Sequence, residues 1–276
     1  MNEQLKYLDR GRLSMVIGSI LLALALSRLL ETPVRPLLRV TAFGSPLGFN
    51  LSATTVMSLI ILGLAITGVT SLLHSQPLAA TAQLDRRFMY WIVPGLLGIA
   101  MAGWLNRIEN AAAWAAALLS CAALLPFVLL VEYGVANRRP PDGGPWLRWS
   151  QMALVHLTAV ILFTLIYSAR ERSLLSGSAV LLVAVLLSAR LFWIHTSLSR
   201  AVTYGAVAGL ILGQMTWVLN YWRLSGLQGG LLLLLLFYVV VGLIQQFLQG
   251  QFGQRIVLEY GSVALIALFL IGLAVP

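Results

Sequence analysis

The sequence predicts an all-α, polytopic membrane protein, and two observations carry this prediction. Hydrophobic residues make up 59% of the 276 residues and charged residues only 10%, a balance far from that of a soluble protein. The hydrophobic residues also gather in continuous stretches of about 20 residues, the length that a helix needs to cross a hydrocarbon core of about 30 Å. Continuous rather than alternating apolar stretches favour helices over a β-barrel.

We expect about nine transmembrane helices, which together form one integral membrane domain, residues 1–276. Short polar loops separate the apolar stretches, so that consecutive helices should run in opposite directions. The predicted helices cover residues 13–30, 51–73, 88–105, 111–131, 150–169, 174–194, 201–222, 229–249 and 256–275.

The segment between the first two helices predicts a small β-hairpin on the extracytoplasmic surface. Gly44-Ser45-Pro46 is a typical turn sequence, and it lies between two extended arms, residues 38–43 and 47–52, in which polar and apolar residues partly alternate. An irregular re-entrant loop is the alternative for this segment.

The basic residues predict that the N-terminus is cytoplasmic and the C-terminus extracytoplasmic. Of the 18 Lys and Arg residues, eleven then lie inside and seven outside, in the sense of the positive-inside rule. The net charge of +9 indicates contact with lipid phosphates rather than nucleic acid, because the chain has no basic tail. The inner residues are Lys6, Arg10, Arg12, Arg86, Arg87, Arg138, Arg139, Arg148, Arg190, Arg200 and Arg255, and the outer ones are Arg28, Arg35, Arg39, Arg107, Arg170, Arg172 and Arg223.

Ionisable side chains at membrane depth are costly, so they are the first candidates for a functional site. Glu132 ends the fourth predicted helix, Glu259 begins the ninth, and Arg190 and His195 lie near the inner end of the sixth. We expect these four residues to form an inner-side polar cluster. Such a cluster is either a site linked to a proton or an anion, or an ion pair that fixes the helix register, and we favour the second.

A second polar group is expected at the outer ends of the helices. Amides and charges at this depth usually hydrogen-bond across helices, so we expect a structural role before a substrate contact. This outer-side polar cluster contains Arg28, Asn106, Arg107, Glu109, Asn220 and Arg223.

Three glycines in the seventh predicted helix form a small-residue face. Gly205, Gly209 and Gly213 recur every four residues, a spacing that allows another helix to approach closely. Packing within the chain is the simpler interpretation, and a dimer interface is the alternative.

The sequence assigns no catalytic residue, and we expect no bound metal or other cofactor. Its single cysteine, Cys121, excludes a disulfide within the chain and a thiol metal cluster. The three histidines do not have the matched spacing that a haem held by two histidines would require, and haem or chlorophyll is therefore not expected. No zinc-protease, serine-nucleophile or phosphate-loop motif is present.

Several short motifs resemble those of an uncharacterised multi-pass membrane protein family of Chloroflexota-type bacteria, which has no assigned activity. The run from Trp217 to Gly230 carries much of the resemblance, together with Phe237-Tyr238 and Gln245-Gln246. The remaining motifs are Phe43-Gly-Ser-Pro-Leu, the stretch from His74 to Pro77, and Val131-Glu-Tyr. The resemblance implies a multi-pass protein of the bacterial cytoplasmic (inner) membrane and implies no reaction.

Three function classes remain open. The first is a non-enzymatic scaffold, assembly or accessory subunit of a membrane complex, whose partners would be membrane lipids and other membrane subunits. The second is a transporter of a small molecule or lipid that uses the inner-side polar cluster. The third is a membrane enzyme acting on a lipid. We favour the first, because the soluble loops are short and buried charges are few.

Overall fold

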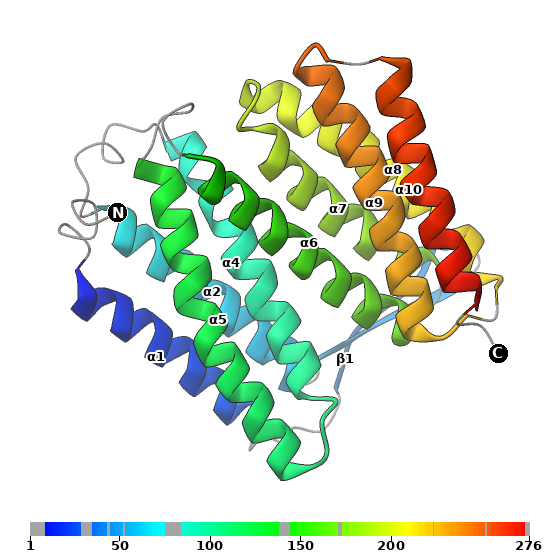
Figure 1. The fold of residues 1–276 in the computed structure, drawn as a ribbon. Helices are drawn as coiled ribbons and strands as arrows, with labels where there is room; N and C mark the ends of the chain where they lie inside the picture. Colours follow the sequence, from blue (N-terminus) through cyan, green and yellow to red (C-terminus); the bar gives the residue numbers. More distant parts are fainter. Residues whose placement is uncertain are drawn as a thin grey trace. The chain divides into compact units, whose positions relative to one another are not determined.

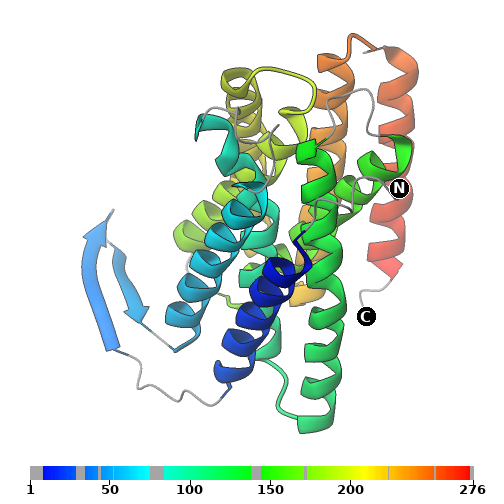
Figure 2. The same ribbon diagram turned by 90° about the vertical axis from the view of Figure 1, so that its left-hand side faces the viewer.

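The chain folds into helices, with one pair of strands (Figures 1 and 2). It divides into two compact units, of which unit 1 is Met1–Arg87 with Pro94–Asn137 and unit 2 is Phe88–Val93 with Arg138–Pro276. The computed structural model describes residues 9–28, 35–42, 45–51, 53–74, 84–137, 144–170, 173–222, 224–251 and 253–273.

Unit 1 is built on a helical core to which four helices contribute. Gly68 lies against Val16, so that the second helix approaches the first closely. Gly98 of the next described helix lies against Ile61, which lets that helix approach the second one. Asn110 begins the last helix of the unit, because its side chain accepts hydrogen bonds from the backbone N–H of Ala112 and Ala113. The helices are α1 (Arg10–Leu26), α2 (Ala53–His74), α4 (Leu84–Leu105) and α5 (Ala111–Asn137).

Unit 2 contains five further helices and the first turns of α4. Helices α7 and α8 pack along each other, as do α6 and α9, and α10 lies beside α9 (Figure 1). A capping box begins α9, in which Ser225 and Gln228 satisfy each other's backbone N–H groups. The helices are α6 (Gly144–Ser168), α7 (Ser173–Phe192), α8 (Leu198–Asn220), α9 (Gly226–Leu248) and α10 (Gln254–Leu273).

The predicted fold class, with nine membrane-spanning helices, is wrong in its count of spans. The described helices coincide with the predicted stretches, but only seven of them are long and apolar enough to cross a membrane: α2, α4, α5, α6, α7, α8 and α9. Helix α1 has 17 residues, because it ends at Leu26 instead of continuing to residue 30. The protein is therefore a multi-pass helical membrane protein with seven candidate spans among the described residues.

The segment between α1 and α2 contains the strands β1 (Arg35–Ala42) and β2 (Ser45–Leu51), drawn as adjacent arrows in Figure 2. They pair antiparallel from Ala42 opposite Ser45 to Arg35 opposite Leu51, with an irregularity between Pro36 and Leu38. The predicted arms were shorter and began later. The extracytoplasmic position of this segment rested on the nine-span topology and is withdrawn with it.

The glycine face of α8 packs against α7 within unit 2. A Cβ atom added at Gly205 would lie 3.0 Å from the carbonyl oxygen of Val185, and one at Gly209 would lie 2.8 Å from that of Leu181. At Gly213 it would lie 3.2 Å from the carbonyl oxygen of Gly177. These oxygens belong to backbone that cannot move aside easily, so the three glycines allow α7 and α8 to touch along their length.

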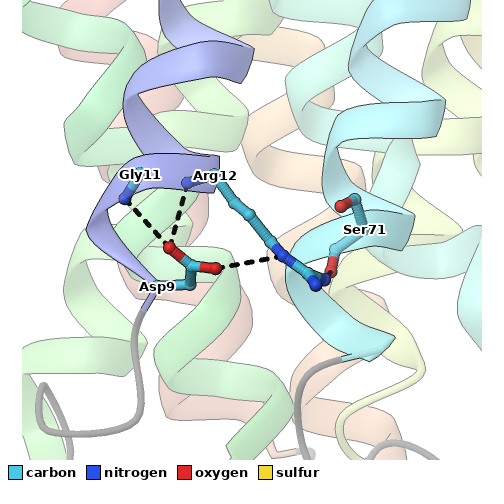
Figure 3. Close-up of polar contacts among 4 residues, drawn as sticks. All are labelled: Asp9, Gly11, Arg12 and Ser71. Carbon is cyan, nitrogen blue, oxygen red and sulfur yellow. Dashed lines mark hydrogen bonds and ion pairs between the residues drawn. The ribbon is translucent and has the colours of Figure 1, made fainter.

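The start of α1 is fixed by a group of polar contacts that Figure 3 shows. The carboxylate of Asp9 accepts hydrogen bonds from the backbone N–H of Gly11 at 3.0 Å and of Arg12 at 3.2 Å, which caps the helix. The Nε atom of Arg12 lies 3.0 Å from the second carboxylate oxygen. Arg12 also donates to the carbonyl oxygen of Ser71 at 3.4 Å, near the end of α2, where the helix dipole favours a positive charge.

Candidate functional site

Arg190 is the most unusual side chain of unit 2, because it is charged and has an exposed fraction of 0%. It lies in the last turn of α7, where its charge complements the unsatisfied carbonyl groups of the helix end. A buried guanidinium group must keep hydrogen-bond acceptors around it, since its transfer out of water is otherwise very costly. The surroundings of Arg190 therefore define the candidate site.

Gln151 supplies the acceptor from the neighbouring helix α6, and it is itself buried, with an exposed fraction of 2%. With the amide oriented so that its oxygen faces Arg190, Oε1 accepts from Nη1 at 2.7 Å and from Nη2 at 2.8 Å. Hydrogen bonds to a charged donor are stronger than those between neutral groups. This contact ties the start of α6 to the end of α7.

Two aromatic rings enclose the same guanidinium group. Its Cζ atom lies 5.2 Å from the ring centroid of Tyr90 and 5.6 Å from that of Trp193. The two rings also meet each other edge to face, with their centroids 5.3 Å apart. Aromatic faces stabilise a cation more strongly when water is excluded. Arg190 is thus held by one amide oxygen and two aromatic faces, which we call the arginine cage (Tyr90, Gln151, Arg190 and Trp193).

His195 lies in the turn between α7 and α8, outside the candidate spans. Its Nε2 atom is 3.4 Å from the side-chain nitrogen of Gln249, at the end of α9. Burial, and then the positive charge of Arg148, hold the pKa of His195 below its usual value of 6.5. Because Gln249 donates this hydrogen bond, the neutral imidazole is the form that the structure favours.

The two glutamates of the predicted inner-side polar cluster have different surroundings. Glu259 is exposed on α10, whereas Glu132 is buried in α5, with an exposed fraction of 2%. Glu132 belongs to unit 1, while Arg190, His195 and Glu259 belong to unit 2. A cluster that joins all four residues stays a prediction.

The outer-side polar cluster divides between the two units in the same way. In unit 1, Arg28 donates to the carbonyl oxygen of Glu109 at 3.0 Å and lies 4.9 Å above the ring of Trp114. Asn106 bridges α4 to α2 by donating to Thr54 Oγ1 at 3.2 Å. These contacts hold helix ends together. Arg107 is exposed in the turn that follows α4.

In unit 2, Asn220 donates to Ser176 Oγ at 2.9 Å and joins the end of α8 to the start of α7. Arg223, the last residue predicted for this cluster, lies outside the described residues. The contact of Asn220 is of the kind expected for an amide between membrane helices, which acts as a link between them.

Sequence reasoning missed Gln151 and Tyr90. Gln151 lies at the start of an apolar stretch, where an amide is easily taken for part of the polar helix end. Tyr90 lies in the first turns of α4, and an aromatic residue near a helix end is typical of a membrane interface. The usable signal was Gln151 itself, a polar side chain followed directly by an apolar helix.

The arginine cage is suited to holding helices together. Of its four side chains, the phenol of Tyr90 is the one that commonly transfers protons in catalysis. Within the described part of the chain, no three His, Cys, Asp or Glu side chains are placed to hold a metal ion. Its chemical capacity is to fix a positive charge between α4, α6 and α7.

Comparison with known proteins gives one match. A protein family described as "Protein of unknown function (DUF5656)" matches residues 33–274. None of the curated proteins and none of the solved structures matches the chain.

Proposed function

Since the chain belongs to the DUF5656 family, whose description gives no function, we propose a function from the residues of the chain itself. We infer that it is a non-enzymatic integral membrane protein that serves as a scaffold, assembly or accessory subunit of a membrane complex. Its partners would be membrane lipids and the transmembrane helices of other subunits.

The exposed side of α10 is the observation that carries this proposal. Leu258, Leu265 and Phe269 have exposed fractions of 73%, 70% and 66%. With Ser262 between them, they recur at intervals of four, three and four residues, the spacing at which two packed helices meet. This stripe (Leu258, Ser262, Leu265 and Phe269) is the docking stripe of α10.

The opposite side of α10 is already occupied. Tyr260 packs against the backbone of Gly242 and its ring lies 5.3 Å from that of Tyr238, so that α9 covers this side. A helix that is fixed on one side and apolar on the other can present the free side to a partner helix.

The arginine cage supports a static role for the protein. A buried charge that is held by an amide and by aromatic rings fixes the helix register, and such fixed contacts are suited to a scaffold. A transported substrate would have to displace one of them.

The experiment places a photo-crosslinking amino acid at residue 265 in cells. The matched control is residue 119 on α5, because Leu119 and Leu265 are similarly exposed, at 71% and 70%. We expect one protein adduct of defined mass from residue 265 and only lipid adducts from residue 119. Deletion of the protein should then also remove the complex that contains the crosslinked subunit. Only lipid adducts at both positions would overturn the proposal.

A transporter is the second candidate, and the complete burial of Arg190 favours it. Charged side chains inside membrane proteins often mark the path of a substrate or ion. Purified protein in vesicles separates the two candidates. Uptake of an anion or lipid that is lost in Arg190→Gln would favour transport, whereas no uptake together with an intact complex in cells would favour the scaffold.

We also propose the bacterial cytoplasmic membrane as the location, with the N-terminus inside and the C-terminus outside. With the seven candidate spans, ten of the 18 basic residues would then lie on the inner side, and an odd number of spans places the two ends on opposite sides. A C-terminal reporter that is active only outside the cytoplasm should give a signal. A signal from the same reporter in the cytoplasm would reverse the assignment.

A further inference from the structure

His156 is a polar side chain near the middle of a membrane span. It lies on α6, whose candidate span runs from Pro145 to Ser168, so it is about 16 Å of helix from either end. Lipid headgroups do not reach this depth, because the hydrocarbon core is about 30 Å thick. Any group that bonds to His156 must come from the protein or be dissolved in the hydrocarbon.

The hydrogen bond of His156 to the backbone fixes its tautomer. Its Nδ1 atom lies 2.8 Å from the carbonyl oxygen of Met152. A carbonyl oxygen only accepts, so Nδ1 carries the hydrogen and Nε2 of the neutral ring presents a bare lone pair. The ring remains neutral at this depth, because a charge in hydrocarbon is costly. Nε2 is therefore an acceptor.

This acceptor is buried and has no hydrogen-bond partner among the described residues. A buried polar atom without a partner costs about 1–3 kcal/mol, and such atoms often mark the place of a missing ligand or water. His156 as a whole is half-buried, while its Nε2 atom is buried.

Two aromatic rings of α9 pack against the imidazole ring of His156. The ring centroid of His156 lies 5.6 Å from that of Phe237 and 6.0 Å from that of Tyr238, both on α9. Phe163 packs on Phe237 at 5.9 Å, and Tyr260 packs on Tyr238 at 5.3 Å. The contacts of His156 and Phe163 are edge to face, an arrangement that another aromatic ring can join. Tyr238 is half-buried, whereas Phe237 is fully buried.

We propose that Nε2 of His156 accepts a hydrogen bond from the hydroxyl group of a lipid-soluble phenol, the class to which reduced quinones belong. The ring of this ligand lies among Phe237 and Tyr238, and its hydroxyl group faces the imidazole. The site goes beyond the assembly role, since it needs no partner subunit. Because Nε2 can only accept, the site binds the quinol, which has hydroxyl groups, and rejects the oxidised quinone, which has only carbonyl groups in their place.

The test follows the nitrogen resonances of His156 in the purified full-length protein in lipid nanodiscs. His74 and His195 are replaced by Gln, so that only His156 reports. A short-chain benzoquinol is added under reducing conditions, and the matching benzoquinone is the control. We expect the Nε2 resonance to move with the quinol and to stay in place with the quinone.

Three results would overturn the proposal. The first is no shift, or the same shift, with both compounds. The second is an Nε2 atom that carries a hydrogen at neutral pH. The third is a resonance that is already hydrogen-bonded and unchanged by the quinol, which would mean that a water satisfies the atom.

Variants separate the acceptor from the aromatic wall. His156→Phe keeps the ring and removes the acceptor, and it should weaken quinol binding roughly threefold to tenfold, as expected for one hydrogen bond. Tyr204→Phe on α8, whose ring packs against Phe247, should bind as the parent does. If His156→Phe fails to fold, His156→Gln serves instead, because its amide both accepts and donates and should therefore bind the quinol and the quinone alike. An unchanged preference for the quinol in a folded His156→Gln protein would contradict the proposal.

Discussion

Units 1 and 2 each contain an arginine that lies against an aromatic ring, and the two arginines differ in burial. Arg28 of unit 1 lies 4.9 Å above Trp114, donates to a backbone carbonyl group and is exposed. Arg190 of unit 2 lies 5.2 Å from Tyr90, donates to Gln151 and has an exposed fraction of 0%.

The difference teaches that the same contact has a different energetic weight in the two places. Water can solvate Arg28 when a partner is lost, so its contacts add little to the free energy of unfolding. The guanidinium group of Arg190 is shielded from water, so water cannot replace an acceptor that is lost, and the loss is costly. The following predictions test this contrast.

The largest effect is expected for Gln151→Leu. This change removes the oxygen that accepts two hydrogen bonds from Arg190, and each bond to a charged group contributes about 1.5–3 kcal/mol. We expect the free energy of unfolding to fall by about 3 kcal/mol, measured by SDS titration in mixed micelles. Gln151→Glu, which keeps the acceptor, is the control. Equal losses in both variants would mean that packing, and not the acceptor, stabilises the cage.

The next largest effect comes from replacing a glycine with alanine in each unit, where we expect the free energy of unfolding to change in opposite directions. Gly209→Ala in unit 2 places a Cβ atom 2.8 Å from the carbonyl oxygen of Leu181 and should cost about 1–3 kcal/mol through overpacking. At Gly63 of unit 1 no atom lies within 4 Å of an added Cβ, so the same substitution should be neutral or slightly stabilising. Both are measured by unfolding in mixed micelles. A loss at Gly63 as large as at Gly209 would contradict the close contact of α7 and α8.

Arg28→Met should have a smaller effect, below about 1 kcal/mol, because a cation over an exposed aromatic ring contributes little. The methionine retains the length of the side chain and removes the charge. The same unfolding assay measures it. A loss as large as that of Gln151→Leu would remove the contrast between the two arginines.

The smallest effect is a dependence on pH through His195, which is partly in contact with solvent. Burial and then Arg148 lower the pKa of His195 below 6.5, so on acidification the unfolded chain takes up a proton before the folded one does. This contribution to stability is constant above about pH 7 and decreases as the pH falls below 6.5. Unfolding measured at pH 8 and pH 5 should show this loss, and His195→Gln should lack it. An unchanged pH dependence in His195→Gln would assign the loss to another group.

Much of the helical framework could be predicted from local sequence. The stretch 111–131 corresponds to α5, which continues to Asn137, and the stretch 201–222 corresponds to α8, which ends at Asn220. Apolar composition over 20 residues determines such helices, because the backbone must satisfy its own hydrogen bonds in lipid. The number of membrane-spanning helices was harder to predict, because a few residues at the end of α1 decide whether this helix is long enough to cross the membrane.

The candidate site was only partly accessible from the sequence. Arg190 stands out in an apolar stretch, but its partners lie on other helices, and no local pattern indicates that Gln151 and Tyr90 face it. Glu259, which the sequence places in the same predicted cluster, is exposed on α10. The direction of a side chain around a helix axis depends on which face is packed, and the neighbours decide that face.

The sequence by itself determined that the chain is a helical membrane protein, where its helices lie, and that Gly205, Gly209 and Gly213 form one face. Only the tertiary structure decided that α7 covers this face, that Gln151 and two aromatic rings hold Arg190, and that Nε2 of His156 is an acceptor without a partner among the described residues. Helix formation depends on local composition and on the absence of water, whereas these contacts depend on which helices become neighbours.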